Sequence, residues 1–168
     1  MKAHKTNAVR ILEANNIPHT TVTYEVNETD LSGITVANKI GIDAERVFKT
    51  LVTRGDKNGI NVFCIPVTEE LDLKKAGLAS GNKKVEMIKE KELLPLTGYI
   101  KGGCSPIGMK KKYPTYIDET AQLFYEIYVS AGIRGMQVKL DPDDLLKIVG
   151  GIFVELIRDN NPDVQTLK

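Results

Sequence analysis

The sequence is poor in the residues from which many catalytic and metal sites are built. It contains only two cysteines and two histidines, and the cysteines do not have the spacing of metal ligands. A zinc motif, a Walker phosphate loop and a dinucleotide-binding fingerprint are all missing. We therefore expect this protein to use no metal and no other cofactor.

A large excess of charge of one sign is missing too. The chain has 23 Lys and Arg against 22 Asp and Glu, which gives a formal net charge of +1. The molecule as a whole therefore has no general electrostatic attraction for nucleic acid. Any contact with nucleic acid must be local and limited to a few phosphates.

Long hydrophobic runs are also absent. No apolar run approaches the roughly 20 residues that a transmembrane helix needs. Residues 1–5 lead into an amphipathic pattern and not into the apolar core of a signal peptide. Two cysteines in a chain of this size suit a reducing compartment. We expect a cytoplasmic protein that makes no contact with a membrane.

What is present is typical of a globular protein. The 168 residues are 42% hydrophobic and 27% charged, and a chain of this length buries roughly two-thirds of its unfolded surface. The sequence shows no internal repeat, linker or low-complexity tract. We expect one domain over residues 1–168, with a polar tail at 159–168.

Capping residues, turn residues and hydrophobic periodicity predict a mixture of helices and strands. Helices are expected after Thr6, Ser32 and Asp141, at 73–78, and in a mixed helical patch at 85–94 that Pro95 stops. Strands are expected at 19–26, 48–54, 60–67, 115–117, 126–130 and 136–140, with 48–67 forming a hairpin. Because there is no regular βαβ rhythm, we predict an α+β or mixed α/β domain in which a barrel-like mixed sheet is flanked by helices.

Two glycine-rich segments adjoin predicted strands, and they are the most informative feature of the chain. We call residues 102–108 the first Gly-rich loop and residues 132–135 the second Gly-rich loop. Glycine lets backbone N–H groups approach a ligand closely because it has no Cβ. Two such loops predict a pocket lined by main chain, although the first could equally be a tight chain crossing near Pro106.

Lys49 lies in the otherwise apolar run 47–52. One interpretation is a solvated lysine on the outer face of a strand. The other is a cation directed into the pocket, where it would bind a phosphate or polarise a carbonyl group. Thr50 points to the opposite face of a regular strand. Both residues can therefore line one pocket only if the strand ends or bulges there.

The sequence offers no convincing protein nucleophile. Cys104 could serve only if His4 or His19 met it in space, and Cys64 is more simply a buried apolar residue. Ser130 has no nucleophile-elbow sequence around it, so we expect it to act through hydrogen bonding.

Other charged residues have simple structural interpretations. Asp118 fits a helix cap better than an acid–base catalyst. The lysine runs 83–84 and 110–112 are either solvated surface or a guide for a polyanion such as the acceptor end of a tRNA.

In their order along the chain, these segments resemble a known family. The resemblance covers residues from about 5 to 158 and rests on Thr23-Tyr24-Glu25, 47–51, 71–75, 83–87, 97–99, 102–108, 128–130 and Arg134-Gly135. The chain is similar to the YbaK-type aminoacyl-tRNA deacylases, relatives of the editing domain inserted in bacterial prolyl-tRNA synthetases.

The resemblance implies hydrolytic editing of Cys-tRNA(Pro), and also of Cys-tRNA(Cys), without a metal. The cysteinyl thiol would attack its own ester carbonyl, so that the protein needs no nucleophile. Lys49 would orient the tRNA 3′ end, Gly102 would contact the ester, and Ser130 would shape the pocket. The remaining substrate-binding residues would be Tyr24, Thr50, Gly103, Ser105 and Arg134. Prolyl-tRNA synthetase would be a partner that supplies extra affinity.

Two positions depart from the family pattern, and two other functions stay open. Gln137 stands where relatives carry an aspartate, and Cys104 stands where an aliphatic residue is usual. Either difference could change the preferred amino acid. The alternatives are a deacylase of other specificity, such as for Ala-tRNA(Pro), and a non-catalytic module that binds tRNA or a nucleotide.

Overall fold

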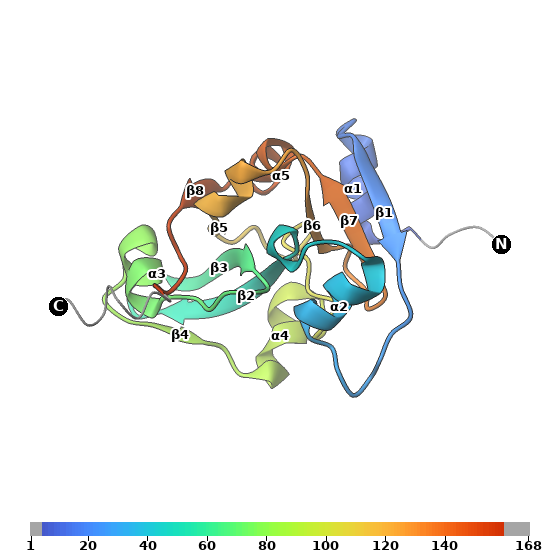
Figure 1. Ribbon diagram of the computed structural model, residues 1–168. Coiled ribbons are helices and arrows are strands. Elements are labelled where there is room, and N and C mark those ends of the chain that lie inside the picture. The colour runs from blue at the N-terminus through green and yellow to red at the C-terminus, as the bar shows by residue number, and fades with distance from the viewer. Residues whose placement is uncertain (1–4, 160–168) are drawn as a thin grey trace.

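The computed structural model describes residues 5–159, so the predicted polar tail lies outside it except for Asp159. Within this range the chain forms five α-helices, two 3₁₀ segments and eight strands (Figure 1). The helices are α1 (Asn7–Ala14), α2 (Gly33–Ile40), α3 (Leu73–Ser80), α4 (Glu90–Thr97) and α5 (Pro142–Val149), and the 3₁₀ segments are η1 (Ala44–Arg46) and η2 (Glu119–Leu123). The strands are β1 (His19–Thr23), β2 (Phe48–Gly55), β3 (Gly59–Pro66), β4 (Val85–Met87), β5 (Thr115–Asp118), β6 (Ile127–Ser130), β7 (Met136–Leu140) and β8 (Ile152–Val154).

The predicted helix caps are confirmed. The Thr6 hydroxyl accepts the Val9 N–H at 3.1 Å at the start of α1. The Ser32 hydroxyl caps α2, and the Asp141 carboxylate caps α5, where Pro142 fills the first helical position. These side chains satisfy N–H groups that have no partner inside the helix.

The strands form two separate sheets. The five-stranded sheet has the order β4-β2-β3-β5-β8, and the predicted β2–β3 hairpin is its centre. Its β3–β5 and β5–β8 pairs are parallel, so the sheet is mixed as predicted. The three-stranded sheet has the order β1-β7-β6 and is antiparallel throughout. In Figure 1 it stands at the right, and the larger sheet extends to the left.

The main core lies between the two sheets. Phe48 and Ile117 come from the five-stranded sheet, Val129 and Val138 from the three-stranded sheet, and Leu145 from α5; all are buried and pack in one cluster. This burial of apolar surface is the main force that holds the sheets together.

The predicted single mixed α/β domain is confirmed, but its sheets do not close into a barrel. Neither sheet closes on itself, and each keeps two edges in the described chain. The two sheets meet through one isolated parallel bridge, between Val47 and Tyr128. Side-chain packing and not a continuous hydrogen-bond ladder therefore joins them.

The predicted helical patch at 85–94 is also wrong in part. Residues 85–87 form β4, which pairs with the end of β2. Helix α4 begins at Glu90 and continues past Pro95 to Thr97. Pro95 costs the helix one N–H donor, but the last turn is held because the Thr97 hydroxyl donates to the Leu93 carbonyl at 2.7 Å. No helix of the described chain is long and apolar enough to cross a membrane.

Candidate functional site

One cavity gathers most of the residues that the sequence indicated. It has a volume of about 350 Å³, which is within the range of small-molecule sites. Its walls come from the start of α2, the start of β2, the first Gly-rich loop and the facing strands β6 and β7. We call it the central cavity; it is lined by Leu31, Ser32, Gly33, Ile34, Val36, Val47, Phe48, Lys49, Thr50, Val67, Lys101, Gly102, Cys104, Ser130 and Gln137.

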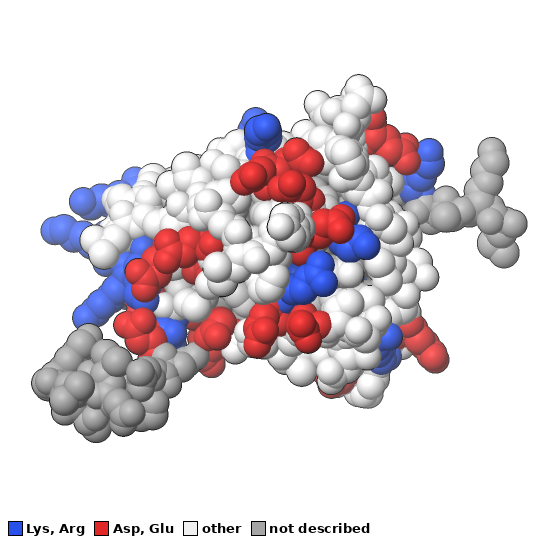
Figure 2. All heavy atoms as spheres, turned by 45° about the horizontal axis from the view of Figure 1, so that its top comes forward, with Lys and Arg blue, Asp and Glu red and all other residues white. Residues whose placement is uncertain are grey.

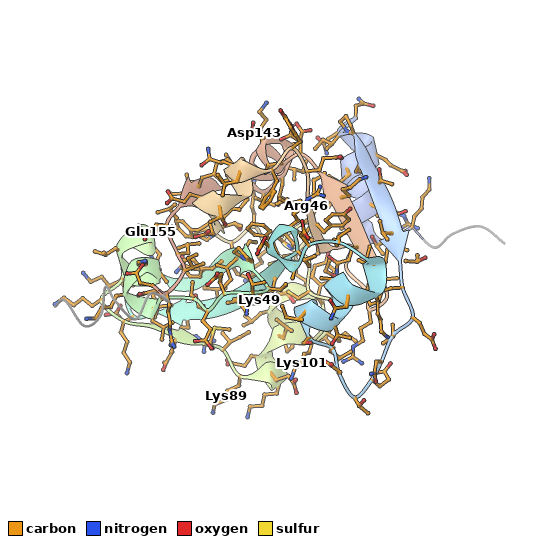
Figure 3. The ribbon with its side chains drawn as sticks, in the orientation of Figure 1. Arg46, Lys49, Lys89, Lys101, Asp143 and Glu155 are labelled. Atoms are coloured by element: carbon orange, nitrogen blue, oxygen red, sulfur yellow. The ribbon has the colours of Figure 1, made fainter. Side chains whose placement is uncertain are left out.

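Lys49 is the second residue of β2, near the centre of the view in Figure 3, and it lines the central cavity together with the start of α2. Its side chain is half-buried, and burial lowers the pKa of its ammonium group, while Glu70 and Glu69 oppose this shift. Within residues 5–159 the ammonium makes no hydrogen bond and no ion pair closer than 4.0 Å. It is therefore available to an acceptor in the cavity.

Thr50 lines the central cavity together with Lys49. Neighbouring residues of a regular strand point to opposite faces. Lys49 and Thr50 are the second and third residues of β2, however, and both border the cavity at this end of the strand. The Thr50 hydroxyl also lies 3.9 Å from the sulfur of Cys64, its partner on β3. Thr50 thus faces the core side of the strand as well as the cavity.

Gly102 supplies the main-chain surface that the sequence predicted. Its φ of +84° favours glycine. A Cβ at this position would lie 3.3 Å from the side chains of Arg134 and Leu31. Its N–H group makes no backbone hydrogen bond within the described chain. This donor is therefore free to bind a carbonyl or anionic oxygen.

The rest of the first Gly-rich loop supports this surface from behind. Gly103 is buried, and a Cβ on it would lie 3.0 Å from the backbone nitrogen of Arg134, so the two Gly-rich loops pack in direct contact. Ser105 is fully buried, and its hydroxyl accepts the Ile107 N–H at 3.2 Å. Neither Gly103 nor Ser105 lines the central cavity.

Tyr24 and Arg134 lie in a small neighbouring recess, which shares Gly102 with the central cavity. The Arg134 guanidinium forms an ion pair with Glu28 at 2.8 Å and donates to the Lys101 carbonyl at 2.8 Å. Arg134 therefore joins Lys101, directly before the first Gly-rich loop, to the segment before α2.

Ser130 and Gln137 face each other across the β6–β7 ladder, and both line the central cavity. The Ser130 hydroxyl accepts the Gly132 N–H at 3.1 Å, which leaves its proton free to donate. Gln137 is buried, and its Oε1 has no hydrogen-bond partner within residues 5–159.

Cys104 is the sole cysteine among the residues that line the central cavity, and it is not prepared for nucleophilic attack. Burial raises the pKa of its thiol to about 12, so the thiol stays protonated near neutral pH. His19 lies on β1, where its Nδ1 is 2.7 Å from the Ile17 carbonyl, and it does not line the cavity. His4 lies outside the described residues.

Sequence reasoning missed the start of α2, where Ser32, Gly33 and Ile34 close the central cavity. The cap followed by glycine was a usable signal, since helix N-termini present free N–H groups. The lysine run 110–112 does not line the central cavity. Lys111 and Lys112 line a separate recess of about 200 Å³ on the far end of the first Gly-rich loop.

The electrostatics of the central cavity favour an electron-rich group. Two lysines line it, and none of its described lining residues is a carboxylate. In the part of the chain that the structure describes, no three His, Cys, Asp or Glu side chains gather as metal ligands. Figure 2 shows acidic and basic side chains interspersed over one face of the molecule, in keeping with the near-zero net charge. The local cavity and not the overall surface therefore selects a ligand.

Fold and site together define a small mixed α/β domain with a cationic, main-chain-lined cavity. Comparison with known families gives it a more specific identity, because residues 32–148 match the aminoacyl-tRNA editing domain. This chain belongs to that family.

Relatives agree with this assignment. The chain is 52% identical over 152 residues to a candidate Cys-tRNA(Pro)/Cys-tRNA(Cys) deacylase, EbsC, of Enterococcus faecalis, with 90% of this chain and 93% of the relative covered. It is 26% identical to the uncharacterized protein YwhH of Bacillus subtilis, with 80% and 88% covered.

Solved structures share the fold. A candidate trans-editing enzyme for prolyl-tRNA synthetase superposes with a TM-score of 0.79 at 24% identity, covering 94% of this chain and all of that one. The hypothetical protein APE2540 gives 0.83 at 17% identity, with 91% and 100% covered. At these identities the likeness establishes the fold alone.

Proposed function

We propose that this protein deacylates misacylated tRNA, with Cys-tRNA(Pro) as its first substrate and Cys-tRNA(Cys) as a second. The central cavity carries the proposal because it combines a free ammonium group and a free glycine N–H with no activated protein nucleophile. The name of the Enterococcus relative supports the choice of substrate.

The reaction uses the thiol of the substrate. The cysteinyl sulfur attacks the ester carbonyl carbon, the bond from that carbon to the ribose oxygen breaks, and the thiol proton passes to the departing oxygen. The products are tRNA with a free hydroxyl group and a cyclic thiolactone, which water then opens to cysteine. The protein accelerates the step by holding sulfur and carbonyl in close contact.

Each wall of the central cavity has a part in this positioning. Lys49 binds the phosphate or the carbonyl oxygen at the tRNA 3′ end. The Gly102 N–H donates to the oxyanion that forms on the ester carbonyl. The Ser130 hydroxyl and Thr50 fix the orientation of the aminoacyl group.

The remaining predicted residues act from further away. Gly103 and Ser105 hold the first Gly-rich loop in shape, and Arg134 and Tyr24 form the recess beside it. The near-zero net charge fits a protein that grips only the acceptor end of the tRNA and gains affinity from prolyl-tRNA synthetase. An aminoacyl-tRNA substrate also implies a cytoplasmic location.

Deacylation by the purified protein tests the proposal directly. Cys-tRNA(Pro), Ala-tRNA(Pro) and Pro-tRNA(Pro) are incubated separately, and the surviving ester is measured over time. We expect rapid loss of cysteine alone. Equally rapid loss of alanine would refute the thiol mechanism and indicate the other deacylase specificity, and stability of all three esters would indicate a binding module.

A further inference from the structure

Gln137 carries an unused hydrogen-bonding group in the wall of the central cavity. The residue is only 6% exposed, and its Oε1 has no partner within residues 5–159. Buried polar groups are almost always paired, because leaving one unpaired costs free energy. An exception in a ligand-sized cavity points to a partner that arrives with the ligand.

The backbone of Gln137 is fixed on both sides. It pairs with Val22 on β1 and with Ser130 on β6, so β7 is the central strand of its sheet. The Ser130 hydroxyl across the ladder accepts the Gly132 N–H and makes no hydrogen bond to the Gln137 Oε1. The strand therefore presents the Gln137 amide to the cavity at a set position.

The central cavity offers free donors, hydroxyl groups that can donate or accept, and the unpaired amide oxygen of Gln137. Lys49 and the Gly102 N–H are free donors, and Lys101 is a further donor that also pairs with Glu90; these groups suit the phosphate and carbonyl oxygens of an aminoacyl ester. The α-amino group of that ester is itself a donor and needs an acceptor. With no carboxylate in the described cavity lining, the Gln137 amide is the side chain best suited to accept it.

We propose that Gln137 binds the α-amino group of the aminoacyl moiety and thereby orients the amino acid in the central cavity. This inference rests on the proposed function, because it takes an aminoacyl ester as the ligand. The amide carries no charge, so it accepts an N–H from the protonated or the neutral amine. Rotation of the amide by 180° exchanges its oxygen and nitrogen, so the same side chain can turn its oxygen toward the amine.

Turnover of two substrates by three proteins tests the contact. The substrates are Cys-tRNA(Pro) and 3-mercaptopropionyl-tRNA(Pro), which keeps the thiol and the ester but lacks the amine. The proteins are the wild type, Gln137→Met, and Gln122→Met as a control for the same change at an exposed glutamine. We expect Gln137→Met to lower kcat/KM for the cysteinyl substrate by about 10- to 150-fold, the range of one hydrogen bond to a charged group, and to leave the mercaptopropionyl substrate within about twofold.

A merely structural role would lower both substrates equally, and that result would overturn the proposal. Unchanged activity of Gln137→Met on the cysteinyl substrate would do so too. If Gln137→Met does not fold, Gln137→Glu serves instead, because it keeps an acceptor oxygen. It should retain the preference for the amine-bearing substrate, and loss of that preference would overturn the proposal.

A binding measurement separates this inference from the proposed deacylase activity. Amide-linked cysteinyl-adenosine and its counterpart without the amine are titrated into the wild type and Gln137→Met. We expect the amine to strengthen binding to the wild type by about 10- to 150-fold and to have little effect in the variant. If the protein binds in this way but deacylates nothing, the proposed function fails and the Gln137 contact stands. If the amine adds nothing to binding, the contact is refuted whatever the turnover.

Discussion

Replacement of Lys49 by methionine should abolish most activity while leaving the fold intact. Methionine keeps the length and the apolar stem of lysine but removes the charge. Within the described chain the Lys49 ammonium makes no hydrogen bond that the change would break, and burial already opposes its charged form, as its lowered pKa shows. We therefore expect the free energy of unfolding to stay equal or to rise slightly.

The loss of activity follows from the one contact that the ammonium is free to make. A hydrogen bond to a charged group contributes about 1.5–3 kcal/mol, and about 1.4 kcal/mol corresponds to a factor of ten. Lys49→Met should therefore lower kcat/KM for Cys-tRNA(Pro) by about 10- to 150-fold. Single-turnover deacylation and chemical denaturation, run on the same preparations, measure the two effects.

Lys101 offers a matched control in the same cavity. Its side chain is 67% exposed, and its Nζ lies 3.4 Å from Glu90 Oε1 in a surface ion pair. In Figure 3 it lies toward the lower edge of the molecule. Exposed charges contribute about 0–1 kcal/mol, so Lys101→Met should cost less than about fivefold. Wild-type activity of Lys49→Met, or an equal loss of activity in both variants, would refute the proposal that Lys49 binds the tRNA 3′ end.

Three further changes test other parts of the structure. Asp118→Ala should lower the free energy of unfolding, measured in urea, by about 2–4 kcal/mol. The reason is that the buried carboxylate accepts N–H groups from both η2 and the segment after β8. The neighbouring Glu119 is exposed, so Glu119→Ala should change the free energy of unfolding by less than about 0.5 kcal/mol. Gly103→Ala should push the two Gly-rich loops apart, since its Cβ would lie 3.0 Å from backbone atoms. We expect the free energy of unfolding to fall by about 1–3 kcal/mol and deacylation to be slower. A fully active, equally stable variant would contradict the packing argument. Burial raises the pKa of the Cys64 and Cys104 thiols from 9.0 to about 12. The unfolded chain then loses these protons first as pH rises, so stability should fall between pH 9 and 12, and less steeply in a Cys104→Ala variant, which should deacylate normally.

Local signals in the sequence were enough for most of the elements. The Thr6, Ser32 and Asp141 caps and the β2–β3 hairpin depend on residues within a few positions of one another, and all are confirmed. Strand β4 could not be predicted in the same way. Residues 85–87 become a strand because the end of β2 offers a free edge, which the segment itself does not encode.

The candidate site was predictable in its parts but not in its assembly. Glycine-rich sequence identified Gly102, and a cation in an apolar run identified Lys49, because both features are local. Gln137 was noted only as a departure from the family pattern, since its significance depends on burial and on the lack of a partner. The roles of these residues toward substrate remain predictions.

The seam between the two sheets has a consequence for how this domain can change. Lys49 and Thr50 stand on the larger sheet and Ser130 and Gln137 on the smaller one. In the described chain a single bridge, between Val47 just before β2 and Tyr128 on β6, connects the two sheets. The width of the cavity is therefore set by the size of the packed side chains at the seam and not by the fixed spacing of paired strands. A change of one or two methylene groups there can move one wall relative to the other while every strand keeps its register. Such a scaffold can be adapted to larger or smaller amino acids by small steps, each of which leaves a folded protein for selection to act upon.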